Sequence, residues 1–257
     1  MTEFELLVKL AEGRVARGVA EPYEERAERI LDAAAGLIVR LGYGKTTIDD
    51  IARRAGVAKG TVYLHWKSRD ALFVALLRRE RVLLLTDARE AVAAAPGGAT
   101  PRALVAAIAT ALARRPLLRA VLVRDLDVIG KLAHDRHQEA VPEAPRALIA
   151  YLDELRALGA VRGDLDGGAL MTIVSATFTG FFFAPWLRAE LTRPDDEVAG
   201  LLADTIDRAL APAVPARPTA RTRTAVSAAT MRLLDDGLAL AAQKLTAAMG
   251  PSESRTR

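Results

Sequence analysis

Six side chains that can bind a polyanion lie within eleven positions of the sequence. They are Lys59, Thr61, Tyr63, His65, Lys67 and Arg69. Lysine and arginine pair with phosphate or guanine edges, threonine can contact a thymine methyl group, and a tyrosine hydroxyl can bond to phosphate. Residues 44–81 contain nine Lys and Arg against four acids, while the whole chain has a net charge of only +4. This concentration of charge favours a nucleic-acid partner, and a solvated basic face is the alternative.

Two short helices at residues 47–55 and 58–66 are expected to position these groups. Their inner faces are marked by small and branched apolar residues: Ile48, Ile51, Ala52, Ala55, Val57, Val62 and Trp66. Gly56 can adopt the left-handed conformation that a sharp turn between the helices needs. The pattern predicts a helix-turn-helix whose second helix presents Lys59, Thr61 and Tyr63 outward. Thr46 or Thr47 would cap the first helix, and Ser68 would cap a long helix that follows.

Composition limits the classes of protein to consider. The chain has 257 residues, of which 51% are hydrophobic and 5% aromatic, and abundant helix formers favour an all-α fold. The absence of cysteine excludes disulfides, thiol catalysis and Cys-ligated zinc. The first ten residues lack the basic segment of a signal peptide. The most apolar run, residues 169–187, is interpreted as a buried helix instead of a membrane span, so we expect a cytoplasmic protein without a membrane partner.

Helical periodicity and breaks divide the chain into four parts. We expect an N-terminal helical extension (1–21), a helix-turn-helix domain (22–70), a larger helical domain (71–212) and a Pro-rich linker with a C-terminal helix (213–257). Further helices are predicted at 4–15, 22–41, 102–114, 116–133, 142–158, 166–190, 195–211 and 224–248. The last helix has an apolar stripe, and we hypothesise that it packs on the larger domain and supports a dimer or closes a pocket.

Residues 29–73, "RILDAAAGLIVRLGYGKTTIDDIARRAGVAKGTVYLHWKSRDALF", resemble the DNA-binding domain of the TetR-type transcriptional regulators in order, spacing and residue type. A weaker similarity covers residues 152–182, which resemble a helix, glycine turn and dimer-proximal helix of that family's second domain. The resemblance implies an all-α homodimer with an N-terminal three-helix DNA-binding domain and a larger helical ligand-binding and dimerisation domain. It also implies a repressor that a small ligand releases from DNA.

Carried over position by position, the resemblance implies a set of DNA contacts. The set is Thr46, Thr47, Ala58, Lys59, Gly60, Thr61, Tyr63, His65, Lys67 and Arg69. Lys59, Gly60 and Thr61 would lie at the floor or edge of the groove, whereas Tyr63, His65 and Arg69 would contact the backbone. The chain departs from the family pattern at three positions. Ala58 replaces a hydroxyl residue that would cap the second helix, Trp66 replaces a phenylalanine, and Arg69 replaces a lysine.

A ligand pocket is predicted from apolar residues at helical spacing in the larger domain. The candidates are Leu104, Ile108, Leu112, Leu126, Ile129, Phe178, Phe182 and Trp186, and ordinary core or dimer interface is the alternative. Few polar groups accompany them, so the ligand would be largely apolar. His134 and His137 could bind a divalent metal with neighbouring acids, although a hydrated loop is the preferred interpretation. No catalytic triad or phosphate-binding glycine loop is present, so we expect no enzyme activity, cofactor or metal.

The sequence thus predicts a dimeric, cytoplasmic regulator that binds an inverted-repeat DNA operator, represses transcription and is released by a small ligand. Two alternatives use the same DNA contacts. One is an architectural or cell-cycle adaptor that binds many chromosomal sites together with a protein partner and no small ligand. The other is a transcriptional activator.

Overall fold

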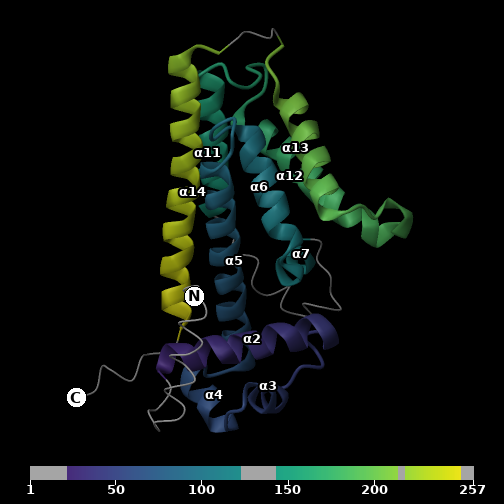
Figure 1. Cartoon of the computed structure of the whole chain (residues 1–257), viewed down its shortest axis with the longest axis vertical. Coiled ribbons are helices and arrows are strands. Elements are labelled where there is room, and N and C mark those ends of the chain that lie inside the picture. The colour runs from purple at the N-terminus through teal and green to yellow at the C-terminus, as the bar shows by residue number, and fades with distance from the viewer. Residues whose placement is uncertain (1–21, 123–142, 214–217, 250–257) are drawn as a thin grey trace, which may run out of the picture.

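The computed structural model describes residues 22–122, 143–213 and 218–249, and all regular structure in these ranges is helical, which confirms the predicted all-α fold. Three helices form the foot of the molecule in Figure 1: α2 (Tyr23–Leu41), α3 (Ile48–Ala55) and α4 (Lys59–His65). The other helices rise from this foot. They are α5 (Arg69–Ala93), α6 (Pro101–Ala113), α7 (Pro116–Leu122), α11 (Glu143–Ala157), α12 (Gly167–Leu187), the 3-10 turn η1 (Ala189–Leu191), α13 (Asp195–Leu210) and α14 (Ala220–Ala248).

Side-chain caps fix where several of these helices begin. Thr47, Ser68 and Thr100 each accept a hydrogen bond from the backbone N–H three residues later, at 3.0–3.1 Å. Such caps satisfy one of the backbone donors that the first turn leaves without a helical partner. The predicted starts at Thr47 and Ser68 are therefore observed. The predicted helix at 4–15 and the His134–His137 pair lie outside the described residues.

Two hydrophobic cores are packed on one shared helix. The lower core joins α2, α3 and α4 to the first two turns of α5, where Leu72, Phe73 and Leu76 are buried. The upper core joins α6, α11, α12, α13 and α14 to the second half of α5, where Ala88 and Val92 are buried. The lower core thus extends beyond residue 70, and it also includes Leu117 and Ala120 of α7.

The C-terminal helix α14 lies along α5 and runs in the opposite direction (Figure 1). Val226, Leu234 and Ala241 of its predicted apolar stripe are buried, and an ion pair joins Asp235 to Arg89 of α5. The packing of this helix on the larger domain is as hypothesised. Its C-terminal end also reaches the lower core, where Met249 packs against buried residues, and this was not anticipated.

The apolar helix α12 departs from the sequence-based expectation. It was interpreted as a buried helix, but only Gly167, Leu170 and Val174 of its residues are buried. Trp186 and Leu187, at its C-terminal end, are each 66% exposed. The expectation of a buried helix is wrong for the single chain, because the described helices pack against only one side of α12. By length and composition alone, α12 is the one described helix that could cross a membrane.

Candidate nucleic-acid interface

A tight turn at Gly56 sets the angle between α3 and α4. Gly56 has φ 65°, a left-handed conformation that glycine adopts without the Cβ clash that other residues suffer. The N–H of Val57 donates to the carbonyl of Ala52 at 3.0 Å and closes the turn. Ile51 and Val62, one from each helix, are 1% and 0% exposed. The two helices therefore form the predicted helix-turn-helix around a dry contact, with the opposite face of α4 exposed to solvent.

The exposed face of α4 carries most of the groove residues predicted from the sequence. Ala58, Lys59, Gly60 and Tyr63 are exposed, and Thr61 is half-buried. A methyl group added at Gly60 would meet no atom within 4 Å. The surface beside Lys59 is therefore open to the close approach of another molecule. Ala58 precedes α4 without a side-chain cap, as its replacement of a hydroxyl residue predicted.

Lys59 has a partner within the protein. Its Nζ donates to Oδ2 of Asp49 on α3 at 2.8 Å, and both side chains are about half exposed. This hydrogen bond raises the pKa of Lys59 above its ordinary value. A base or phosphate that takes Lys59 must therefore compete with the Asp49 carboxylate, which also places a negative charge at the edge of the interface.

Two of the predicted contact residues lie inside the domain, which corrects the sequence-based interpretation. Thr46 is 1% exposed, and its hydroxyl donates to the Gly42 carbonyl at 2.9 Å. His65 is 3% exposed, with its ring 3.9 Å from the ring of Tyr23 and 5.3 Å from that of Trp66. Side chains so enclosed cannot reach a phosphate without rearrangement, because both are held by packing within the lower core.

Comparison with known proteins identifies this unit. Residues 30–76 match the model of the family described as bacterial regulatory proteins, tetR family. Residues 30–76 are thus similar to a domain of the tetR family, and we call this unit the TetR-like domain. The chain is 34% identical over 126 residues to the HTH-type transcriptional repressor KstR of Mycolicibacterium smegmatis, covering 45% of this chain and 59% of that protein. It is 39% identical over 75 residues to the HTH-type transcriptional activator FasR of the same organism, covering 29% and 34%.

A likeness to a solved structure extends beyond this domain at the level of the fold. The structure of the transcriptional regulator FadR from Bacillus subtilis, in complex with stearoyl-CoA, aligns with a TM-score of 0.57 and 19% identity. The alignment covers 70% of this chain and 96% of that one. The match shows a shared fold. The chain spans less than two thirds of the length of the curated relatives it matches.

Arg69 forms an internal clamp in the TetR-like domain, because its side chain bonds to the loop before α3. Its Nη1 donates to the carbonyl of Thr46 at 3.0 Å and more weakly to that of Tyr43 at 3.4 Å, and its guanidinium lies 4.1 Å from the Tyr43 ring centre. The Tyr43 hydroxyl donates to Asp70. Burial, together with this hydrogen bond, raises the pKa of Tyr43 to about 12, so the hydroxyl remains a donor in ordinary buffers. Lys67 is exposed beside this clamp.

Arg69 and Lys67 are expected to have different roles. Arg69 stabilises the domain, whereas Lys67 is exposed and available to DNA. We expect Arg69→Ala to lower the free energy of unfolding by about 1–3 kcal/mol, because two backbone carbonyls lose a charged donor. We expect Lys67→Ala to change it by less than about 0.5 kcal/mol while weakening binding to all duplexes alike. Urea unfolding and DNA titrations at several salt concentrations measure both effects. Equal stability of the two variants would contradict the clamp.

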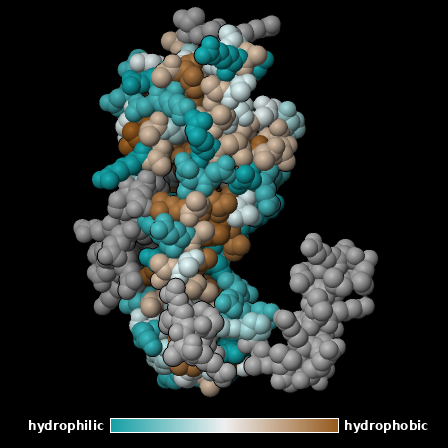
Figure 2. Space-filling model, turned by 90° about the vertical axis from the view of Figure 1, so that its left-hand side faces the viewer, coloured by the Kyte–Doolittle hydropathy of each residue, from teal (hydrophilic) through white to brown (hydrophobic). Residues whose placement is uncertain are grey.

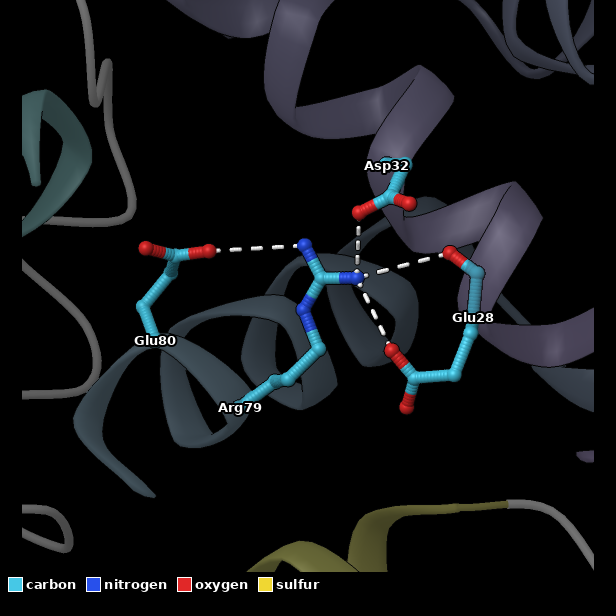
Figure 3. A network of polar contacts seen from close by, with 4 residues as sticks. All are labelled: Glu28, Asp32, Arg79 and Glu80. Carbon is cyan, nitrogen blue, oxygen red and sulfur yellow. Dashed lines mark hydrogen bonds and ion pairs between the residues drawn. The ribbon is translucent and has the colours of Figure 1, made fainter. Parts of the chain in front are cut away.

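Arg79 of α5 joins the TetR-like domain to the rest of the chain, and sequence patterns did not reveal this role. Figure 3 shows its guanidinium between Glu28 and Asp32 of α2 and the adjacent Glu80. Nη1 lies 3.0 Å from Glu28 Oε2 and 2.7 Å from Asp32 Oδ1, and Nη2 lies 3.4 Å from Glu80 Oε1. Burial alone would lower the pKa of Arg79, but the carboxylates of Asp32 and Glu28 outweigh burial and raise it. The residue therefore stays charged and fixes α2 on α5.

The predicted ligand-pocket residues are only partly brought together. Leu104 and Leu112 of α6 are in the upper core, and Phe178 and Phe182 of α12 pack against it with ring centres 6.2 Å apart. Ile108 also packs there. Leu126 and Ile129 lie outside the described residues. The structure therefore places these apolar side chains of α6 and α12 in or against the upper core, and a ligand pocket among them stays a prediction.

Trp186 does not line an enclosed pocket. It is 66% exposed and lies against Phe183 with ring centres 5.2 Å apart. The prediction that Trp186 lines the ligand pocket is therefore wrong for the single chain, because the end of α12 extends away from the upper core. An open cavity of about 620 Å³ lies between α5 and α6, and its lining, which includes Ala103 and Arg114, contains none of the predicted ligand residues. Within the described ranges, no three acids or histidines come together as a metal site.

Proposed function

We propose that the chain is a sequence-specific DNA-binding transcriptional regulator, and that it acts as a repressor which a small apolar ligand releases. The observation that carries the proposal is the exposed face of α4, where Lys59, Gly60 and Tyr63 project beside the capped start of α3. A helix of this kind fits the major groove, where base edges are read, while neighbouring cations hold phosphate. The match of this region to repressor KstR supports the assignment.

The regulator would act as a homodimer through the outer face of α12. Trp186, Leu187 and Leu191 are exposed near the α12–α13 connection, which projects from the body of the protein in Figure 1, and Leu201 of α13 is 45% exposed. Exposed apolar surface of this kind is expected to be covered by a partner. A two-fold dimer would present two copies of α4, so the preferred operator would be an inverted repeat.

The releasing ligand would be largely apolar. FadR, which shares the fold, was solved with stearoyl-CoA. The apolar lining on α6 and α12 supports a ligand of similar character here, with a long acyl chain as one candidate. Release requires that the ligand bind the DNA-free conformation more tightly than the DNA-bound one. We infer no catalytic role, and we place the regulator in the cytoplasm with its DNA.

Activation of transcription is a second candidate, because the same region matches the activator FasR. The DNA contacts of an activator and of a repressor can be identical, so the position of the bound site relative to the promoter distinguishes them. An adaptor of chromosome structure would instead occupy dozens of scattered sites. Mapping of occupied sites in cells, followed by reporter assays with the gene deleted, separates the three functions.

The primary test is the selection of duplexes from a random pool by the full-length protein. We expect enrichment of an inverted repeat, bound by two chains, with an affinity at least about a thousandfold above that for a scrambled duplex. Sedimentation of the complex measures the number of chains. A protein that remains monomeric and binds every duplex equally would refute sequence-specific regulation.

A further inference from the structure

The C-terminal helix α14 is attached to the upper core near its beginning. The Tyr151 hydroxyl on α11 and the Thr230 hydroxyl lie 2.9 Å apart, and both residues are buried. Thr230 donates its own proton to the Val226 carbonyl, so Tyr151 is the donor. Burial raises the pKa of Tyr151 to about 12, which keeps that donor in place. Arg232 adds an ion pair with Glu154 of α11 at 2.6 Å.

The other end of α14 is attached to the DNA-binding domain. The indole N–H of Trp66 donates to the carbonyl of Ala248 at 3.1 Å, and Arg78 donates to the carbonyl of Lys244 at 3.0 Å. Ala248 is the last residue of α14, so its carbonyl has no acceptor role within the helix. Ala248 and Met249 also pack against the lower core.

Trp66 links α14 to α4, because Trp66 is also the C-cap of α4. We call α4 the recognition helix, since it carries the proposed base contacts. Its backbone N–H donates to the Val62 carbonyl, while its ring is 3% exposed. A helix of seven residues has little stability of its own, so its position depends on such tertiary contacts. From Thr230 to Ala248, α14 spans about 27 Å at 1.5 Å per residue. One rigid element thus connects α11 to the end of the recognition helix.

Among the described residues, α14 contacts α5, α11 and α6, and part of its surface is exposed. Seen from the left-hand side of Figure 1, the surface mixes hydrophilic and hydrophobic residues, with hydrophobic ones gathered about half-way up (Figure 2). Asp236, Ala239 and Gln243 of α14 are exposed. One face of the helix therefore packs on α5 while residues on the other face are exposed in the described part of the chain.

We propose that α14 couples the upper core to the recognition helix, with Trp66 as the positioning residue that receives its C-terminal end. A change in packing around α11 would move α14 and, through the bond from the Trp66 indole to Ala248, alter the placement of α4. The consequence for DNA binding rests on the proposed function. The physical coupling itself does not, because it can be measured without DNA.

The test uses hydrogen exchange of backbone amides in the full chain. Trp66→Phe keeps one aromatic ring but removes the indole N–H together with the second ring, which also leaves a small cavity because Trp66 is buried. We expect it to speed exchange of residues 59–66 by about twofold to tenfold, the range for loss of one neutral hydrogen bond. Unchanged exchange at 59–66 in Trp66→Phe would overturn the proposal.

A second variant tests whether a change at the upper attachment of α14 alters amide exchange in α4. Tyr151→Phe removes the hydroxyl at the upper attachment, and we expect faster exchange both at 226–234 and at 59–66. In the Trp66→Phe background the effect of Tyr151→Phe on residues 59–66 should vanish, because two changes in one linkage are not additive. Residues 101–113 of α6 serve as the internal reference for general loss of stability. Faster exchange at 226–234 alone would show that α14 transmits nothing.

Measurement of DNA binding by the Trp66→Phe variant distinguishes failure of this proposal from failure of the proposed function. Trp66→Phe should weaken binding to the selected duplex by the same factor by which it speeds exchange. Parent protein that binds no duplex would refute the proposed function and leave the exchange result to decide the coupling. Faster exchange with unchanged DNA affinity would overturn the role of Trp66 in positioning the recognition helix.

Discussion

Loss of the Lys59 side chain is expected to cost each protomer about 1–3 kcal/mol of binding free energy on the preferred duplex, a five- to 150-fold loss per recognition helix. Lys59 is the exposed cation at the start of α4, and its amine can reach a base edge once it leaves Asp49. Lys59→Ala also leaves the Asp49 carboxylate without its partner at the interface. Thr61→Ala, at the half-buried neighbouring position, should show a loss in the same range.

Fluorescence anisotropy with the selected and scrambled duplexes measures this effect. Losses on the selected duplex should exceed those on the scrambled one, because a base contact carries sequence preference. Arg221→Ala removes an exposed charge near the start of α14, far from the foot of the molecule, and serves as the control. Asp49→Asn removes the competing carboxylate and should not weaken binding. Full affinity and specificity in folded Lys59→Ala and Thr61→Ala would mean that α4 does not read DNA.

Replacement of Arg79 is expected to give a large loss of stability, about 2 kcal/mol, and to lower the melting temperature by about 4–8 °C. Arg79→Met keeps an apolar stem of similar length but leaves the carboxylate of Glu80, which is 14% exposed, without its cation. Glu28 and Asp32 are 52% and 74% exposed, so water can replace part of what they lose. For this reason the expected cost is below that of a fully buried pair.

The matched control is Arg53→Met, which breaks an ion pair with Asp50. The Arg53 side chain is 76% exposed, so its loss should change stability by less than about 0.5 kcal/mol. Calorimetry of both variants measures the difference. If Arg79→Met melts with the parent protein, the cluster of Figure 3 does not fix α2 on α5.

Local features of the sequence were sufficient to predict the helix-turn-helix. A capping threonine, a glycine at the turn and an apolar residue every three or four positions act over a few residues, and all three appear at Thr47, Gly56 and Val62. The same reasoning placed Lys59 and Tyr63 on the exposed face of α4. Contacts of this kind depend on short-range geometry, which the order of residues largely determines.

Interactions between distant segments could not be predicted in the same way. Arg69 was expected to hold phosphate, but its guanidinium donates to backbone carbonyls whose positions depend on the loop before α3. His65 was expected to face DNA, but it lies against Tyr23 at the start of α2, 42 positions away in the sequence. Nor did any local signal connect Trp66 with Ala248, whose hydrogen bond spans 182 positions.

Both hydrophobic cores include residues of α5, so the two parts of the protein are not independent units. Leu72, Phe73 and Leu76 complete the lower core, while the same uninterrupted helix carries Ala88 and Val92 into the upper one. Unwinding α5 at either end removes packing from a core, so the two units should lose structure in one cooperative step. A chimera that exchanges DNA-binding domains between regulators must therefore carry the first two turns of α5. Division directly after α4 would separate that domain from the buried side chains of Leu72, Phe73 and Leu76 that complete its core.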